Sequence, residues 1–93
     1  MSRDTICAAI KNKEVLSFTY SRTVRTVEPH LLGYDGDGDL TLSAWQLSGT
    51  GTGWRDFHVS KLSGLATTGD SFAGPRRGYN PHDETIGQVV CCL

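Results

Sequence analysis

Hydrophobic residues recur with two different periods, and the change of period divides the chain. Over residues 3–13, Ile6 and Ile10 fall at helical spacing, which predicts a short helix with one apolar stripe. Over residues 15–20 apolar and polar side chains alternate, as in a strand with one buried face. A helix this short is not stable alone, so we expect it to lie against a sheet.

Further strand-like runs follow, separated by turn-forming residues. They are residues 24–34, 40–45, 54–59 and 62–66. Five short strands after one helix predict a mainly β chain, whose antiparallel sheet bends into a small barrel over about residues 14–68. We expect one domain, residues 1–93, because a chain of this length supports a single core.

The tail, residues 69–93, has too many glycines and prolines for a regular element, so we expect it to be irregular. Its last ten residues fit a terminal strand or a turn equally well. Phe72 and Tyr79 are the expected anchors onto the barrel. Arg76 and Arg77 could contact a nucleic-acid backbone or a partner, or they could simply be solvated.

A polar stretch interrupts the second strand-like run at residues 25–30. It sets Arg25, Glu28, Pro29 and His30 inside what should be a paired strand. Proline has no N–H to donate, so Pro29 predicts an edge, a bulge or the end of pairing. Because buried charges need partners, this stretch should either face water or form a polar cluster.

A second polar and aromatic stretch, residues 54–59, has a similar composition, and we expect the two to meet in space. Arg25 and Arg55 are then candidate anion ligands, since a guanidinium fork binds phosphate or carboxylate through two hydrogen bonds. The alternative is structural, with Arg25 paired to Glu28 and Arg55 paired to Asp56 or another acid.

The histidines and tryptophans near these stretches are open to the same two interpretations. His30 and His58 could bind phosphate or respond to pH, or they could be satisfied polar groups in strands. Trp45 and Trp54 could stack on a nucleobase, or they could cover the barrel surface.

Charge and cysteine content limit the classes of function. The net charge of −1 gives no general attraction to nucleic acid, so such binding would need a local patch. Cys7, Cys91 and Cys92 have no metal-ligand spacing and are expected to be reduced thiols. With no long apolar stretch and no signal-like segment, we expect a cytoplasmic protein.

No motif predicts catalysis, a cofactor or a metal, and we expect a protein that is not an enzyme. The Asp35–Asp39 loop begins like a calcium loop but continues with Leu40 where glycine is needed and has Gln46 at the twelfth position. A hairpin connection is the better interpretation of that loop.

Several of these segments together resemble the WYL domain family. The matching segments are Leu16-Ser17-Phe18-Thr19-Tyr20, Arg25-Thr26-Val27-Glu28-Pro29-His30, Leu40-Thr41-Leu42-Ser43-Ala44-Trp45 and the run from Arg55 to Leu65. The resemblance covers about residues 3–68. Of the Trp-Tyr-Leu tripeptide that names the family, Leu40-Thr41-Leu42 keeps the leucine.

The resemblance implies an SH3-like (Sm-like) barrel and a ligand-sensing role in bacterial transcription regulation or defence. The expected ligand is a phosphorylated ligand, nucleotide or short single-stranded nucleic acid. The chain has no room for a helix-turn-helix, so we expect a free-standing WYL-like domain. The candidate ligand-binding residues are Arg25, His30, Trp45, Arg55, His58 and Lys61, with Arg76 and Arg77 from the tail. The alternative is an accessory domain that binds a protein or a second copy of itself and no nucleotide.

Overall fold

An antiparallel sheet of six strands forms most of the structure, a computed structural model that describes residues 2–93. In chain order the elements are α1 (Ser2–Asn12), β1 (Glu14–Tyr20), β2 (Thr23–Asp35), β3 (Leu40–Ser48), β4 (Gly53–His58), a 3-10 turn η1 (Val59–Lys61), β5 (Ser63–Ser71) and β6 (Ile86–Cys92). The mainly β class and the N-terminal helix are confirmed.

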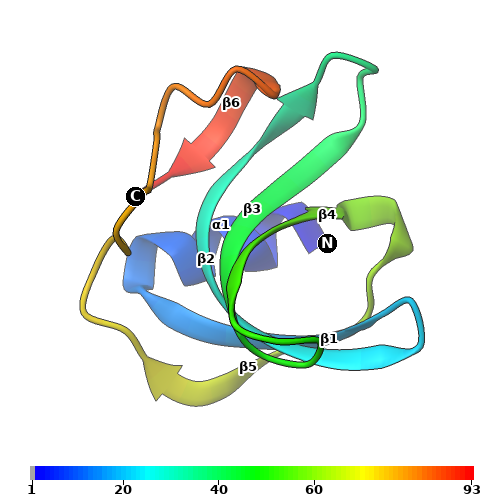
Figure 1. Cartoon of the computed structure of the whole chain (residues 1–93), viewed down its shortest axis with the longest axis vertical. Helices are drawn as coiled ribbons and strands as arrows, with labels where there is room; N and C mark the ends of the chain where they lie inside the picture. The colour runs from blue at the N-terminus through cyan, green and yellow to red at the C-terminus, as the bar shows by residue number, and fades with distance from the viewer. Residues whose placement is uncertain (1) are drawn as a thin grey trace.

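The strand order is β4-β3-β2-β1-β5, and β6 joins β2 off this path (Figure 1). Within residues 2–93, β4 and β5, the two ends of the path, do not pair with each other. The sheet is therefore strongly bent but not closed by hydrogen bonds, and it has six strands where the sequence predicted five.

Strand β2 organises the sheet because it pairs with three other strands. β3 runs along one of its edges from Thr26 to Tyr34. On the other edge β1 pairs with it up to Val27, and β6 pairs from Leu31 onward. Pro29, which has no N–H, lies in the interval between these two partners, beside a register shift in the β3 pairing. The expected disturbance of pairing at Pro29 thus takes the form of a register shift between Pro29 and Leu31.

The C-terminal part is more regular than the sequence predicted. β5 extends to Ser71, and Ile86–Cys92 forms a strand instead of an irregular tail. The residues of β6 are largely exposed, so they lack the alternating apolar pattern by which a strand is recognised. Its pairing with β2 depends on contacts with residues far away in the sequence.

Gly33 permits β6 to approach β2. A Cβ atom at this position would lie 2.4 Å from Ile86 Cγ2 and 2.5 Å from the Gln88 carbonyl oxygen. We expect Gly33→Ala to lower the free energy of unfolding by about 2 kcal/mol, because backbone must move to remove the clash. Urea unfolding measures it, with Gly36→Ala as the control, since nothing lies within 4 Å of a Cβ at Gly36. If the two changes lowered the free energy of unfolding equally, the close approach of β6 to β2 at Gly33 would be contradicted.

The core lies between helix α1 and the bent sheet. Figure 1 shows α1 crossing behind β2 and β3 in this view. The helix buries the stripe predicted from its sequence, and the strands supply the alternating apolar residues. The core residues are Ile6, Ala9, Ile10, Leu16, Phe18, Val27, Leu32, Leu42, Ala44 and Phe57.

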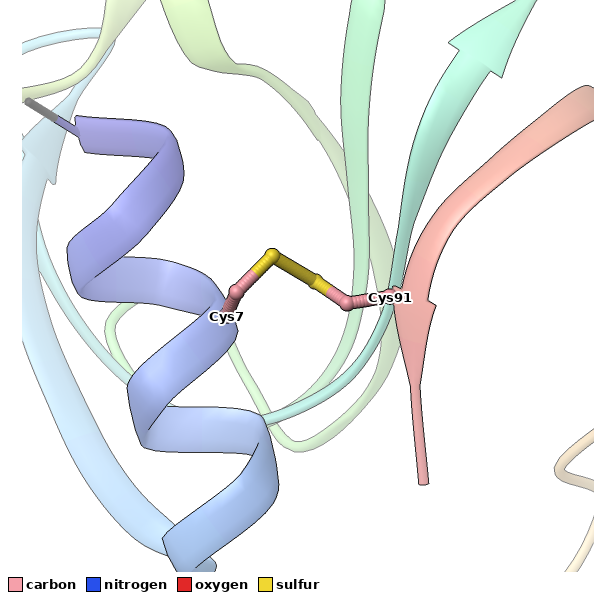
Figure 2. The surroundings of a disulfide bond; sticks show 2 residues. All are labelled: Cys7 and Cys91. Atoms are coloured by element: carbon pink, nitrogen blue, oxygen red, sulfur yellow. A yellow bond between two sulfur atoms is a disulfide. The ribbon is translucent and has the colours of Figure 1, made fainter.

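A disulfide joins helix α1 to strand β6, between Cys7 and Cys91 (Figure 2). The expectation of three reduced thiols is thus wrong; within the described residues only Cys92 is a free cysteine, and it is exposed. Adjacent Cys91 and Cys92 gave no indication of this bond, because the partner of Cys91 is 84 residues away in the sequence. Disulfides are typical of proteins in oxidising compartments, so this bond is not what the expected cytoplasmic location predicts.

None of the helices in residues 2–93 is both long enough and apolar enough to cross a membrane.

Candidate functional site

Arg25 is an almost completely buried residue of β2. The residue is 8% exposed, and its cross-strand partner is Phe18. It donates hydrogen bonds to Gln46 Oε1 (3.1 Å), Thr50 Oγ1 (3.0 Å) and the Tyr20 carbonyl (3.1 Å). All three acceptors are neutral.

No carboxylate forms a salt bridge with Arg25 in the described part of the chain, and its buried Nε has no hydrogen-bond partner. The guanidinium carbon lies 5.7 Å from the Tyr20 ring centroid and 5.9 Å from that of Phe57, so aromatic faces supply part of its stabilisation. Burying a cation without a counter-ion costs free energy, so an arginine in this environment is unusual in a folded protein.

Arg55 reaches the same loop from β4. Its guanidinium donates to the Trp54 carbonyl (2.9 Å) and to the Thr50 carbonyl (3.4 Å). Thr50 thus accepts hydrogen bonds from both arginines, through its hydroxyl from Arg25 and through its carbonyl oxygen from Arg55. Gln46 fixes the loop further, with hydrogen bonds to the Thr50 hydroxyl and the Gly51 carbonyl.

The loop between β3 and β4 approaches Arg25 closely because of its glycines. Gly49 has φ 133°, and a Cβ there would lie 2.8 Å from Arg25 Cδ. A larger residue would push the loop away from the arginine. We call Arg25, Gln46, Thr50 and Arg55 the arginine cluster.

On the other face of the sheet, the tail is fixed by an ion pair between Arg76 and Glu28. The guanidinium contacts both carboxylate oxygens, at 2.7 and 3.0 Å. Its carbon also lies 5.4 Å from the ring centroid of Trp45, which pairs with Glu28 across β2 and β3. Hydrogen bonding to the Glu28 carboxylate raises the pKa of Arg76. Glu28 therefore pairs with the tail instead of Arg25.

His30 is fully buried beneath the tail, with both ring nitrogens occupied. Nδ1 lies 2.7 Å from the Glu28 carbonyl, and Nε2 accepts a hydrogen bond from the Arg76 amide at 3.0 Å. This pattern requires the neutral tautomer with the proton on Nδ1. Burial is the main cause that lowers the pKa of His30. In this conformation the imidazole has a structural role.

An aromatic cluster surrounds this histidine. Its ring centroid lies 4.8 Å from that of Trp54, 5.3 Å from that of Tyr79 and 5.6 Å from that of Phe72. Trp54 also contacts Trp45 edge-on at 5.6 Å, and its Nε1 donates to the Arg77 carbonyl. Burial raises the pKa of Tyr79 to about 12. Phe72 and Tyr79 thus anchor the tail, as the sequence predicted.

The remaining candidates lie away from the arginine cluster. Lys61 is exposed in η1, and Arg77 is exposed in the tail. His58 lies at the end of β4, where its Nδ1 is 3.9 Å from the Asp35 carboxylate.

Asp35, Asp39 and His58 place potential metal ligands within 4.8 Å of one another. Asp35 Oδ1 accepts hydrogen bonds from the amides of Asp37 and Asp39, and its Oδ2 accepts one from the Thr41 hydroxyl. The Asp39 amide is the main cause that lowers the pKa of Asp35. These bonds hold the hairpin loop between β2 and β3, in agreement with the prediction of a hairpin connection.

The two polar stretches do meet, but their side chains separate onto the two faces of the sheet. Arg25 and Arg55 converge on Thr50 on one side. His30 and Trp54 contact each other on the other side, under the tail. The sequence did not predict that Gln46 and Thr50 would bind Arg25, because these contacts join segments that are far apart in the chain.

Two cavities lie on the tail side. One, of about 200 Å³, is lined by Ser43, Trp54, Arg55, Asp56, Gly78, Tyr79, Asn80 and Asp83. The other, of about 500 Å³, is lined by Glu28, Phe72, Ala73, Gly74, Pro75 and Arg76. The two charges of the larger cavity neutralise each other in the Glu28–Arg76 pair.

Comparison with known proteins gives one informative similarity. No protein-family model matches the chain, and no curated protein matches it. Among solved structures, the proteasome accessory factor B/C (PafBC) of Arthrobacter aurescens is similar to it with a TM-score of 0.75 and 26% sequence identity. The similarity covers 89% of this chain but only 14% of the PafBC chain. It supports a WYL-like relationship for the fold described above.

Proposed function

We propose that this chain is a regulatory, ligand-sensing domain of WYL type, with an SH3/Sm-like barrel, that binds a phosphorylated ligand through Arg25 and Arg55. The similarity to PafBC supports a regulatory ligand-sensing role in general terms. The nature of the ligand is the more specific part of the proposal. It includes nucleotides and short single-stranded nucleic acids, which share the phosphate group, and it involves no catalytic step.

The observation that carries this proposal is the buried guanidinium of Arg25, which has only neutral hydrogen-bond acceptors and an unpartnered Nε. An anion would supply the missing counter-charge. Two guanidinium groups already converge on two oxygens of Thr50, its hydroxyl and its carbonyl. Phosphate oxygens would be stronger acceptors than either of them, because their negative charge attracts the guanidinium and their geometry allows two parallel hydrogen bonds to it.

In this proposal Thr50 is displaced when the ligand binds. The loop that carries it is exposed and has positive φ at glycines 49, 51 and 53. The ligand would have to replace the hydrogen bonds that hold Thr50 to the arginine cluster. His30 keeps its structural role, and Lys61, His58 and Arg77 are not needed for the contact.

Binding to a labelled single-stranded oligonucleotide and to pyrophosphate tests the proposal. We expect saturable binding that weakens with salt, with a slope of about −0.7 per phosphate contact for the single strand. Arg55→Gln should lower the affinity roughly tenfold, because it removes a charged hydrogen bond. Arg25→Lys keeps the charge but loses the fork, and it should also weaken binding.

Arg77→Gln is the matched control, since this exposed arginine lies outside the cluster and its side chain should not contribute. Each variant is checked for folding by circular dichroism before the titration. If the Arg25→Lys/Arg55→Gln double variant is folded and binds as tightly as the parent, the site is wrong. A response to pyrophosphate but not to the oligonucleotide would select a small phosphorylated ligand.

A further inference from the structure

The smaller cavity has a chemistry opposite to that of the arginine cluster. It lies where β4 meets the segment of residues 78–83, and it is lined by two carboxylates, Asp56 and Asp83. Asp56 is paired across the strands with Ser43, which also lines the cavity. These groups come from elements that are far apart in the sequence, so the fold has to bring them together.

The two carboxylates have no cation of their own. Within residues 2–93 neither forms a salt bridge. Arg55 also lines the cavity, but its guanidinium donates to the carbonyls of Trp54 and Thr50. Partial desolvation is the main cause that raises the pKa of Asp56, although the residue as a whole is exposed at the rim of the cavity, and the Asp83 charge raises it further. A hydrogen bond from Ser43 and the proximity of His58 partly offset these effects. The lining therefore carries two negative charges against the one positive charge of Arg55.

Two aromatic rings form part of the same wall. Trp54 and Tyr79 stack with an interplanar angle of 23° and a centroid distance of 6.5 Å, and both line the cavity. The face of an indole or phenol ring attracts cations electrostatically, most strongly for tryptophan. Carboxylates beside aromatic faces form an environment suited to an organic cation, which needs both charge neutralisation and an apolar contact.

We propose that this cavity binds the ammonium or guanidinium group of a small organic cation. Its volume of about 200 Å³ is below the usual range for drug-sized ligands, so the ligand must be small or insert only one end. Calcium or magnesium would make no use of the two aromatic faces, which offer these ions no oxygen ligand. The two sites share Arg55, which belongs to the arginine cluster and also lines this cavity, but the carboxylates and aromatic rings that would bind the cation are not part of that cluster.

Titration with agmatine, which carries one guanidinium and one ammonium group, tests the site. Trp54 lines the cavity, so its fluorescence should change saturably on binding, and calorimetry measures the affinity. The Asp56→Asn/Asp83→Asn variant should bind roughly tenfold more weakly or worse, since it removes both charges. Asp83 also accepts a hydrogen bond from the Thr85 amide, so the folding of this variant is checked by circular dichroism and urea unfolding before the titration.

Asp70→Asn is the matched control, because Asp70 is exposed on β5 away from the cavity, and it should leave the affinity unchanged. Potassium chloride at equal ionic strength should give no saturable signal. The proposal is overturned if agmatine gives no saturable response, if the double variant binds as well as the parent, or if magnesium or calcium competes for the cavity more strongly than agmatine.

Discussion

Replacing Cys7 with serine is expected to lower the free energy of unfolding by about 4 kcal/mol. The disulfide to Cys91 closes a loop across 84 residues, nearly the whole chain, and it restricts the unfolded state strongly. The chain-entropy relation gives a stabilisation of about 4–5 kcal/mol for a loop of this size, at the upper end of what native disulfides contribute. Small domains have a low free energy of unfolding, so a loss of this size would greatly increase the unfolded fraction of the protein.

Chemical denaturation with and without a reducing agent measures this effect. The parent protein should lose stability when reduced, whereas Cys7→Ser should behave identically in both conditions. Cys92→Ser is the control, because this exposed cysteine is free, and its effect should stay within about 0.5 kcal/mol. Titration of three thiols in unreduced, denatured parent protein would show that the bond does not form.

Phe57→Ala is expected to have an effect of similar size, about 4 kcal/mol, for a different reason. The side chain is 1% exposed and packs edge-on against Phe18 at 4.9 Å and Tyr20 at 5.0 Å. Truncation leaves a cavity in the middle of the core, and large-to-small changes of phenylalanine cost about 3–5 kcal/mol. Phe57 also supports Arg25, whose guanidinium carbon lies 5.9 Å from its ring centroid.

The urea midpoint of this variant is compared with those of two others. Phe57→Leu retains most of the volume and should cost less than half as much. Val24→Ala serves as the surface control, because Val24 on β2 is 62% exposed. A loss of less than about 1 kcal/mol in Phe57→Ala would mean that the core does not depend on this ring.

The first four strands could be predicted from the sequence because each has a strong local pattern. Alternating side chains from Leu16 to Tyr20 place one face in the core, and the glycine-rich loops mark the turns. Pro29 correctly indicated an irregularity in β2, since the missing N–H is a property of the residue itself. Strand β6 lacks such a pattern, and its existence depends on the edge of β2 that β1 leaves free.

The polar contacts were predictable in type but not in partner. Arg25 and Arg55 were expected to converge, and they do so on Thr50, a loop residue with no distinctive local signal. The expected pairing of Arg25 with Glu28 is wrong, because Arg76, 48 residues beyond Glu28, takes that carboxylate. A charged residue pairs with an oppositely charged residue that the fold brings close to it. Spacing in the sequence does not show which residue that will be.

The position of β6 on β2 has a consequence for the order of folding. β1, β2, β3 and β4 are neighbours in both sequence and sheet, so their pairing closes only short loops. β6 reaches β2 only after the intervening chain has been ordered, and such distant pairings form slowly. We therefore expect the segment that carries Arg76 to settle after the first strands have paired. The aromatic face formed by Trp45 and Trp54 would then be the last surface of the domain to be covered, and every newly made chain would expose it for a time.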